Sequence, residues 1–130
     1  MRVYLVRHAE AAPGEPDDLR TLTPAGRGAA RALGERLSAE GAHPSTVLTS
    51  PLLRARQTAA ELARALGCEH EADERLAPGA TAETVRAAVA ARGDEIVVVG
   101  HQPDCGRIAA ELSGGDEPSF PPAGVAVLEL

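Results

Sequence analysis

The order of apolar and amphipathic segments along the chain predicts an α/β domain with a mostly parallel sheet. Three observations support this fold class. Short apolar runs of strand length alternate with longer segments whose apolar residues recur at helical spacing. Residues that favour helix N-termini and C-termini mark the boundaries of those longer segments. Strands that alternate with helices favour a sheet covered on both faces, a three-layer α/β/α sandwich. The length of 130 residues suits one domain, residues 1–130.

The first predicted strand and helix lie in the N-terminal third of the chain. Residues 2–6 (RVYLV) form an apolar run with β-branched and aromatic side chains, which predicts a buried strand. Thr23 suits an N-cap and Pro24 suits the first position of a helix, which we expect to continue until Gly41. The residues expected on its buried face are Ala29, Leu33 and Leu37.

The same pattern recurs in the middle of the chain. Residues 46–49 predict a second strand, and Ser50 and Pro51 repeat the N-cap and proline signal for a second helix that ends at Gly67. The expected apolar stripe of this helix comprises Ala55, Ala59, Leu62, Ala63 and Leu66.

The remaining elements continue the alternation. A helix is predicted from about residue 81 to residue 92, and residues 95–99 (EIVVV) are the clearest strand in the chain. Another helix should run from Pro103 to about Leu112, and residues 125–128 predict the last strand.

The composition excludes several classes of protein. With 44% apolar and 25% charged residues, the chain has no apolar run of the roughly 18 residues needed to cross a membrane. The first residues do not resemble a signal peptide, so we expect a cytoplasmic protein. A formal charge of −6 argues against a nucleic-acid partner. Cys68 and Cys105 are too few for a disulfide framework, and we expect both to be small buried thiols.

Two histidines and two arginines occupy positions from which they can share one ligand site. In open α/β sheets the ligand binds beyond the carboxyl ends of the strands, where Arg7, His8 and His101 follow predicted strands. Arg54 falls close to the first turn of the second predicted helix, where a cation is unfavourable unless an anion is bound. Helix N-termini and guanidinium groups together bind phosphate well. This arrangement predicts phosphoryl chemistry.

Other residues and other chemistries are less well supported. Arg56 points to a different side of the helix from Arg54, and we expect it on the surface, as we do His43 and His70. The chain has no lysine and so no P-loop lysine, and it has no nucleophile-elbow serine. Neither cysteine has the arginine that a cysteine phosphatase loop needs, and no histidine pair has metal-ligand spacing. The remaining nucleophile is an imidazole.

Four segments, in order, resemble the signatures of the histidine phosphatase superfamily, also called phosphoglycerate-mutase-like. They are Arg7–Glu10 (RHAE), Leu22–Gly26 (LTPAG), Ser50–Thr58 (SPLLRARQT) and Val99–His101 (VGH). The absence of a large insertion makes the chain most similar to the short phosphohistidine phosphatases of the SixA type. The resemblance implies a phosphoglycerate-mutase-like fold.

The resemblance also implies a role for each of the four site residues. His8 would be the nucleophile that accepts the phosphoryl group, while Arg7, Arg54 and His101 hold the phosphoryl oxygens. A free imidazole has a pKa near 6.5, so His8 can attack as a neutral base without a metal ion or cofactor. His101 would act as a cation or as a hydrogen-bond donor to the oxygens.

The chain departs from the pattern of the larger superfamily members at two places. Ala9 stands where they usually have glycine, which implies that no positive φ is needed there. A glutamate acts as general acid after an Arg-Leu pair in those members, but here residues 75–76 are followed by Ala-Pro-Gly. Glu10, Asp17 and Asp18 could replace that acid, or could be solvated loop charges.

The missing acid favours a substrate with a P–N bond, because imidazole leaves phosphorus more easily than an alkoxide does. We also count Arg20, Ser50, Glu10 and Asp17 as candidate substrate-binding residues, with a surface role as the alternative for Arg20. A short chain has few residues for a lid, so the site should be open and suited to a phosphorylated protein. The predicted function is a phosphohistidine phosphatase. The alternatives are a phosphomonoesterase for small sugar or nucleotide phosphates and a non-catalytic phosphate-binding module.

Overall fold

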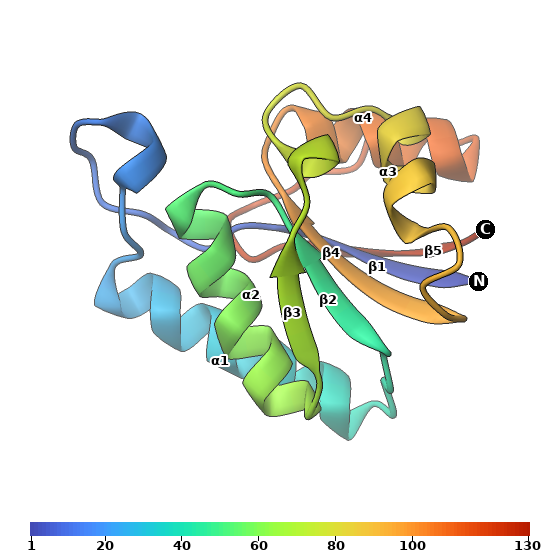
Figure 1. The fold of residues 1–130 in the computed structure, drawn as a ribbon, viewed down its shortest axis with the longest axis horizontal. Helices are drawn as coiled ribbons and strands as arrows, with labels where there is room; N and C mark the ends of the chain where they lie inside the picture. Colours follow the sequence, from blue (N-terminus) through green and yellow to red (C-terminus); the bar gives the residue numbers. More distant parts are fainter.

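The computed structural model describes all 130 residues as a five-stranded sheet with helices on both faces (Figure 1). The strands are β1 (Arg2–Arg7), β2 (Thr46–Thr49), β3 (Glu69–Ala72), β4 (Glu95–Gly100) and β5 (Val125–Glu129). The helices are α1 (Pro24–Ala39), α2 (Leu53–Leu66), α3 (Ala82–Val89) and α4 (Asp104–Ser113), with short 3-10 helices η1 (Asp17–Leu19) and η2 (Glu74–Leu76).

The sheet has the strand order β3-β2-β4-β1-β5, and the prediction of a mostly parallel sheet is confirmed. Four strands run parallel, and only β5 at one edge is antiparallel to its neighbour β1. In the register, Arg7 of β1 lies opposite Gly100 of β4, and Thr49 of β2 lies opposite Val99. The residues that follow these three central strands therefore emerge at the same edge of the sheet.

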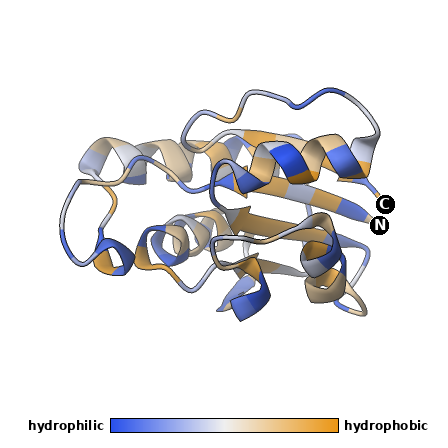
Figure 2. Ribbon diagram, turned by 90° about the horizontal axis from the view of Figure 1, so that it is seen from above, coloured by the Kyte–Doolittle hydropathy of each residue, from blue (hydrophilic) through white to orange (hydrophobic).

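Two hydrophobic cores, one on each face of the sheet, hold the three layers together. Val3 and Leu5 of β1 pack with residues of α3 and α4, while the alternate residues Tyr4 and Val6 pack with α1 and α2. Figure 2 shows the hydrophobic strands in the middle of the molecule and hydrophilic residues recurring along the helices and loops. Each fully buried aliphatic side chain contributes about 1.5–3 kcal/mol, so this double burial determines the position of β1 and β4.

Helix α1 begins as predicted. The Thr23 side chain accepts a hydrogen bond from the Gly26 amide, and Pro24 occupies the first helical position. A Cβ atom at Gly26 would lie 2.1 Å from the Glu10 carbonyl oxygen, so this glycine lets the loop after β1 pack directly on the helix. The expectation for Ala29 was wrong, because this residue is exposed and the neighbouring Ala30 faces the core.

Helix α2 starts later than Ser50 and Pro51 suggested. Its first residue is Leu53, and Leu52 occupies the N-cap position without a side-chain cap. The Ser50 hydroxyl accepts a hydrogen bond from the Leu52 amide instead, in the turn before the helix. The buried stripe of α2 is as predicted, and the helix ends at Gly67 in the left-handed conformation.

Strand β3 and the end of α3 differ from the predictions. The sequence of β3, Glu-His-Glu-Ala, is exposed and has no apolar pattern, so only pairing with β2 makes it a strand. Helix α3 ends at Val89 rather than near residue 92, where Arg92 donates its amide to the Val89 carbonyl in a turn. Cys105 is buried as expected, but Cys68 is half-buried at the end of α2. No helix is both long enough and apolar enough to span a lipid bilayer.

Candidate active site

The candidate active site lies at the carboxyl ends of β1, β4 and β2. His8 follows β1 and His101 follows β4, and the centroids of their rings are 5.2 Å apart with the planes tilted by 59°. Backbone hydrogen bonds fix both chain segments, because the His8 amide donates to the Gly100 carbonyl and the Ser50 amide donates to the Val99 carbonyl. The sheet edge therefore brings together the two histidines that the sequence analysis paired.

A main-chain carbonyl orients the ring of His8. Its Nδ1 atom lies 2.7 Å from the Ala9 carbonyl oxygen, and because a carbonyl only accepts, Nδ1 must carry the proton. The neutral ring then has its lone pair on Nε2. Burial lowers the pKa of His8 below its ordinary value, and the positive charges of Arg54 and Arg7 lower it further. His8 is therefore a neutral base at physiological pH.

Ala9 is held in place by the start of helix α2. Its amide donates to the Thr58 hydroxyl at 3.0 Å, and Thr58 in turn donates to the Arg54 carbonyl. The backbone of Ala9 does not adopt a positive φ, so alanine replaces glycine there without strain, as predicted. The sequence analysis assigned no role to Thr58, although it lies in the matched segment SPLLRARQT.

Arg54 and Arg7 each keep one buried hydrogen-bond donor unused, and the charge of each acts on His8. Arg54 is buried, and its Nη1 and Nη2 atoms donate to the carbonyl and the carboxylate of Asp17 at 2.9 Å and 3.3 Å. The Nη1 atom of Arg7 donates to the Phe120 carbonyl at 2.9 Å. The Nε atoms of both guanidinium groups are buried and have no partner. Unpaired buried N–H groups on cations suit an anion with several acceptor oxygens.

His101 is more deeply buried than His8. Its side chain is 5% exposed, and its Nε2 atom lies 2.7 Å from the Ser50 hydroxyl oxygen. Burial lowers the pKa of His101 to about 4, with further lowering from the nearby His8 and Arg54. Of the two forms we expected, a cation or a neutral hydrogen-bond donor, burial favours the neutral donor.

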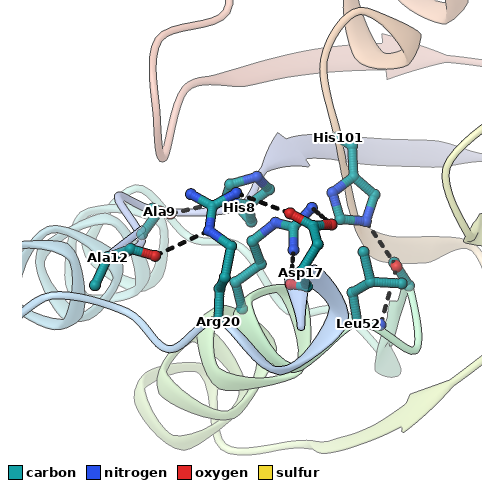
Figure 3. A network of polar contacts seen from close by, with 9 residues as sticks. His8, Ala9, Ala12, Asp17, Arg20, Leu52 and His101 are labelled. Atoms are coloured by element: carbon teal, nitrogen blue, oxygen red, sulfur yellow. Dashed lines mark hydrogen bonds and ion pairs between the residues drawn. The ribbon is translucent and has the colours of Figure 1, made fainter. Parts of the chain in front are cut away.

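The loop of residues 12–20 brings the charged side chains of Asp17 and Arg20 to Arg54. Asp17 bridges Arg54 and Arg20, whose Nη1 atom lies 3.2 Å from the other Asp17 oxygen (Figure 3). Arg20 also donates from Nε to the Ala12 carbonyl at 2.9 Å. The hydrogen bond from Arg20 holds the pKa of the Asp17 carboxyl below its usual range, with Arg54 adding to the effect. In this arrangement Asp17 is a carboxylate and has no proton to give.

The other candidates lie farther from the pair of rings or behind it. Ser50 is fully buried behind His101, so it contacts the ring rather than the open side of the site. Glu10 is exposed and accepts a hydrogen bond from the Thr23 hydroxyl at 2.7 Å, at the start of α1. Asp18 is exposed in η1 and makes no side-chain hydrogen bond or ion pair. The residues expected on the surface, His43, Arg56 and His70, are exposed.

Sequence reasoning missed the carbonyl groups that position the arginines. Phe120 lies on the loop before β5, and its buried side chain anchors the carbonyl that accepts from Arg7. Gln57 accepts a hydrogen bond from the Leu22 amide and so ties α2 to the segment before α1. A main-chain carbonyl has no sequence signature, whereas Gln57 and Thr58 both stand in the matched segment SPLLRARQT and could have been noticed. No group of three or more His, Cys, Asp or Glu side chains is arranged to hold a metal ion.

Comparisons with known proteins identify the family and the fold of the chain. A sequence model of the histidine phosphatase superfamily (branch 1) matches residues 3–78. The chain is 40% identical over 123 residues to an uncharacterized protein of Picosynechococcus sp., a match that covers 88% of this chain and 74% of the relative. It is 32% identical over 125 residues to phosphohistidine phosphatase SixA of Escherichia coli, with 91% and 78% covered. A solved structure of the protein histidine phosphatase SixA complexed with tungstate superimposes with a TM-score of 0.91 at 30% identity, covering 100% of this chain and 88% of that one.

Proposed function

The chain belongs to the histidine phosphatase superfamily and is a phosphatase, and from this premise we propose that it hydrolyses phosphohistidine on proteins. The observation that carries the proposal is the orientation of His8. Its Nδ1 atom is bound to the Ala9 carbonyl, so Nε2 is left as a nucleophile, with the His101 ring 5.2 Å away and the positive charges of Arg54 and Arg7 close enough to lower the His8 pKa.

We propose a reaction in two steps. The phosphoryl oxygens bind to Arg7, Arg54 and His101, which stabilise the negative charge that the transition state spreads over these oxygens. His8 Nε2 attacks phosphorus, the P–N bond of the substrate breaks, and the leaving imidazole takes a proton from water. A second water then attacks phosphorus, the bond to His8 breaks, and inorganic phosphate leaves. The proton that the second water loses neutralises the hydroxide left by the first. The sum is phosphohistidine plus water giving histidine plus phosphate.

Two observations favour a P–N substrate over a phosphate ester. Asp17, the carboxylate nearest to the arginines, is ionised and engaged by Arg20 and Arg54, and Glu10 is bound to Thr23. A poor leaving group such as an alkoxide needs a proton donor, whereas imidazole needs little assistance. The relative in Escherichia coli is named for phosphohistidine, which favours the same substrate. The tungstate in the similar SixA structure is a tetrahedral oxyanion like phosphate and supports phosphoryl binding for either substrate.

We also propose that the reaction needs no metal ion. The guanidinium groups of Arg7 and Arg54 supply the positive charge that a metal would bring to the phosphoryl oxygens. Activity should therefore persist in the presence of a chelator, and loss of activity with EDTA that added Mg²⁺ restores would contradict this part of the proposal. We place the enzyme in the cytoplasm, where its two cysteines would remain the free thiols that they are here.

The test is to trap the intermediate. The enzyme is quenched during turnover of a ³²P-phosphohistidine peptide, and the label on the protein should be acid-labile and alkali-stable. His8→Ala should remove both the label and the activity, while His43→Ala, at an exposed histidine, should keep both. Faster turnover of p-nitrophenyl phosphate than of the peptide would favour a small-molecule phosphomonoesterase. Turnover without any label on wild-type protein would contradict the intermediate on His8.

A further inference from the structure

Ser50 is a fully buried polar residue with a single partner inside the site. It follows β2 directly, and its hydroxyl lies 2.7 Å from Nε2 of His101. The same oxygen accepts a hydrogen bond from the Leu52 amide at 3.2 Å. The main-chain groups of Ser50 are also used, because its amide donates to the Val99 carbonyl and its carbonyl accepts from the Thr49 hydroxyl.

The Ser50 hydroxyl has a single acceptor to which it can donate its proton. The Leu52 amide is a donor, so the only acceptor bonded to the hydroxyl is Nε2 of His101. If Nε2 carried a proton instead, the Ser50 hydroxyl would receive two hydrogen bonds and its own proton would be buried without a partner. Buried polar groups are very rarely left unpaired, so Ser50 donates to Nε2.

This donation determines where the proton on His101 sits. A neutral imidazole that accepts at Nε2 carries its proton on Nδ1, and in Figure 3 the His101 ring points toward Asp17 and His8. His8 is fixed by the Ala9 carbonyl, which leaves a lone pair on its Nε2 atom. The two neutral imidazole rings, with centroids 5.2 Å apart, therefore have different roles. His8 has a lone pair with which to attack phosphorus, and His101 has an N–H group to donate to the phosphoryl oxygens.

We propose that Ser50 is a positioning residue that keeps His101 as the neutral Nδ1–H tautomer, a hydrogen-bond donor to the phosphoryl oxygens. This inference rests on the proposed function and explains how the second histidine donates without being charged. It replaces the direct contact with substrate that we predicted for Ser50, since the residue has no exposed surface. The charged groups around His101 are Arg54 on α2, Arg7 at the end of β1 and Asp17 on η1, with the titratable His8 beside it.

The first experiment measures the tautomer in the wild-type enzyme. Long-range ¹H–¹⁵N correlation spectra at pH 7 should give His101 a protonated Nδ1 and an unprotonated Nε2. The His101→Gln spectrum assigns the signals. A neutral His101 ring protonated on Nε2, or a charged ring at this pH, would overturn the inference without bearing on whether His8 is phosphorylated.

The second experiment removes the hydroxyl. Ser50→Ala should free the His101 ring to turn as well as to adopt both neutral tautomers, and should lower kcat by about 10- to 100-fold, the range seen when a partner that orients a metal-bound histidine is removed. Thr46→Val, a control on the same strand, removes a buried hydroxyl that bonds the Glu69 carbonyl rather than Ser50 or His101, and should stay within about three-fold of wild type. Thermal unfolding of both variants separates a fold defect from a site defect.

The pH dependence of kcat distinguishes a positioning role of Ser50 from a role in packing alone. The imidazolium form of His101 has N–H groups on both nitrogens, so the difference in kcat between wild type and Ser50→Ala should narrow as pH falls toward the His101 pKa, about 4. A folded Ser50→Ala enzyme with the wild-type tautomer and wild-type kcat would overturn the inference. Wild-type enzyme that neither turns over phosphohistidine nor takes up label would instead contradict the proposed function.

Discussion

The rear and the front of the candidate site are built in different ways. The rear wall, made of Ser50, Arg54 and His101, is buried, and each of these residues follows directly from a central strand or from the helix after it. The front loop, residues 12–20, is mostly exposed, and the Asp17 side chain retains 63% of its accessible surface. The difference indicates that the groups proposed to bind phosphate are held rigidly by the fold, while those proposed to meet the rest of the substrate lie on an exposed loop.

The physical origin of this difference is the hydrogen bonding of the two regions. In the rear wall, the Ser50 amide donates to the Val99 carbonyl of β4 and His101 follows β4 directly, so moving these residues disturbs the sheet edge. In the front loop, the exposed Asp17 carboxylate pairs with Arg20 of the same loop and with the buried Arg54. The pair with Arg20 lies near solvent and contributes little to stability, so substrate can displace it at small cost.

Substitution of a rear-wall residue should lower activity more than a change in the front loop. Arg54→Ala should lower kcat/KM by about 10²- to 10³-fold, because it removes a buried donor from the developing charge. Arg56→Ala, two residues along the same helix and exposed, should remain within about two-fold of wild type. Steady-state kinetics on a phosphohistidine peptide measure both. Equal losses in the two variants would mean that the burial of Arg54 is unrelated to catalysis.

Acid should inactivate the enzyme through the nucleophile. Protonation of Nε2 removes the lone pair of His8, so kcat/KM should fall about ten-fold per pH unit below the His8 pKa. Because burial and nearby arginines lower that pKa, the midpoint of the acid limb should lie below the ordinary histidine value of about 6.5. A pH–rate profile on the peptide tests this. A midpoint above that value would show that the site does not disfavour the charged ring.

A change in the front loop should alter binding more than chemistry. Asp17→Asn removes a negative charge that occupies Arg54 and Arg20 in the free enzyme, so inorganic phosphate should inhibit about two- to five-fold more tightly. Inhibition constants at low salt measure the effect, and it should shrink at high salt. Weaker inhibition by phosphate would mean that Asp17 positions the arginines rather than competing for them.

The smallest effect is expected at Glu10. Its carboxylate contacts the Thr23 hydroxyl, and glutamine offers an acceptor oxygen at the same place. Glu10→Gln should therefore keep kcat and KM for the phosphohistidine peptide within about two-fold of wild type. A larger loss of kcat, with KM unchanged, would identify Glu10 as the proton donor that the sequence analysis considered.

Much of the fold and the membership of the candidate site could be predicted because they depend on local patterns. The strands β1 and β4 carry continuous apolar runs, as strands buried on both faces do, and Thr23 with Pro24 marks the start of α1. Parallel strands of this kind end at one edge, so the convergence of His8 and His101 follows from the strand prediction. Where no local pattern exists, as in the exposed strand β3, the prediction failed.

The sequence alone therefore determined the α/β class, the family and the residues that gather at the sheet edge. The tertiary structure decided how each of them is protonated and held: Ser50 bonds to His101, 51 positions away, and Phe120 bonds to Arg7, 113 positions away. Periodicity and capping describe neighbours within a few residues, whereas a hydrogen bond to a buried ring or a main-chain carbonyl depends on which distant segments the fold brings into contact.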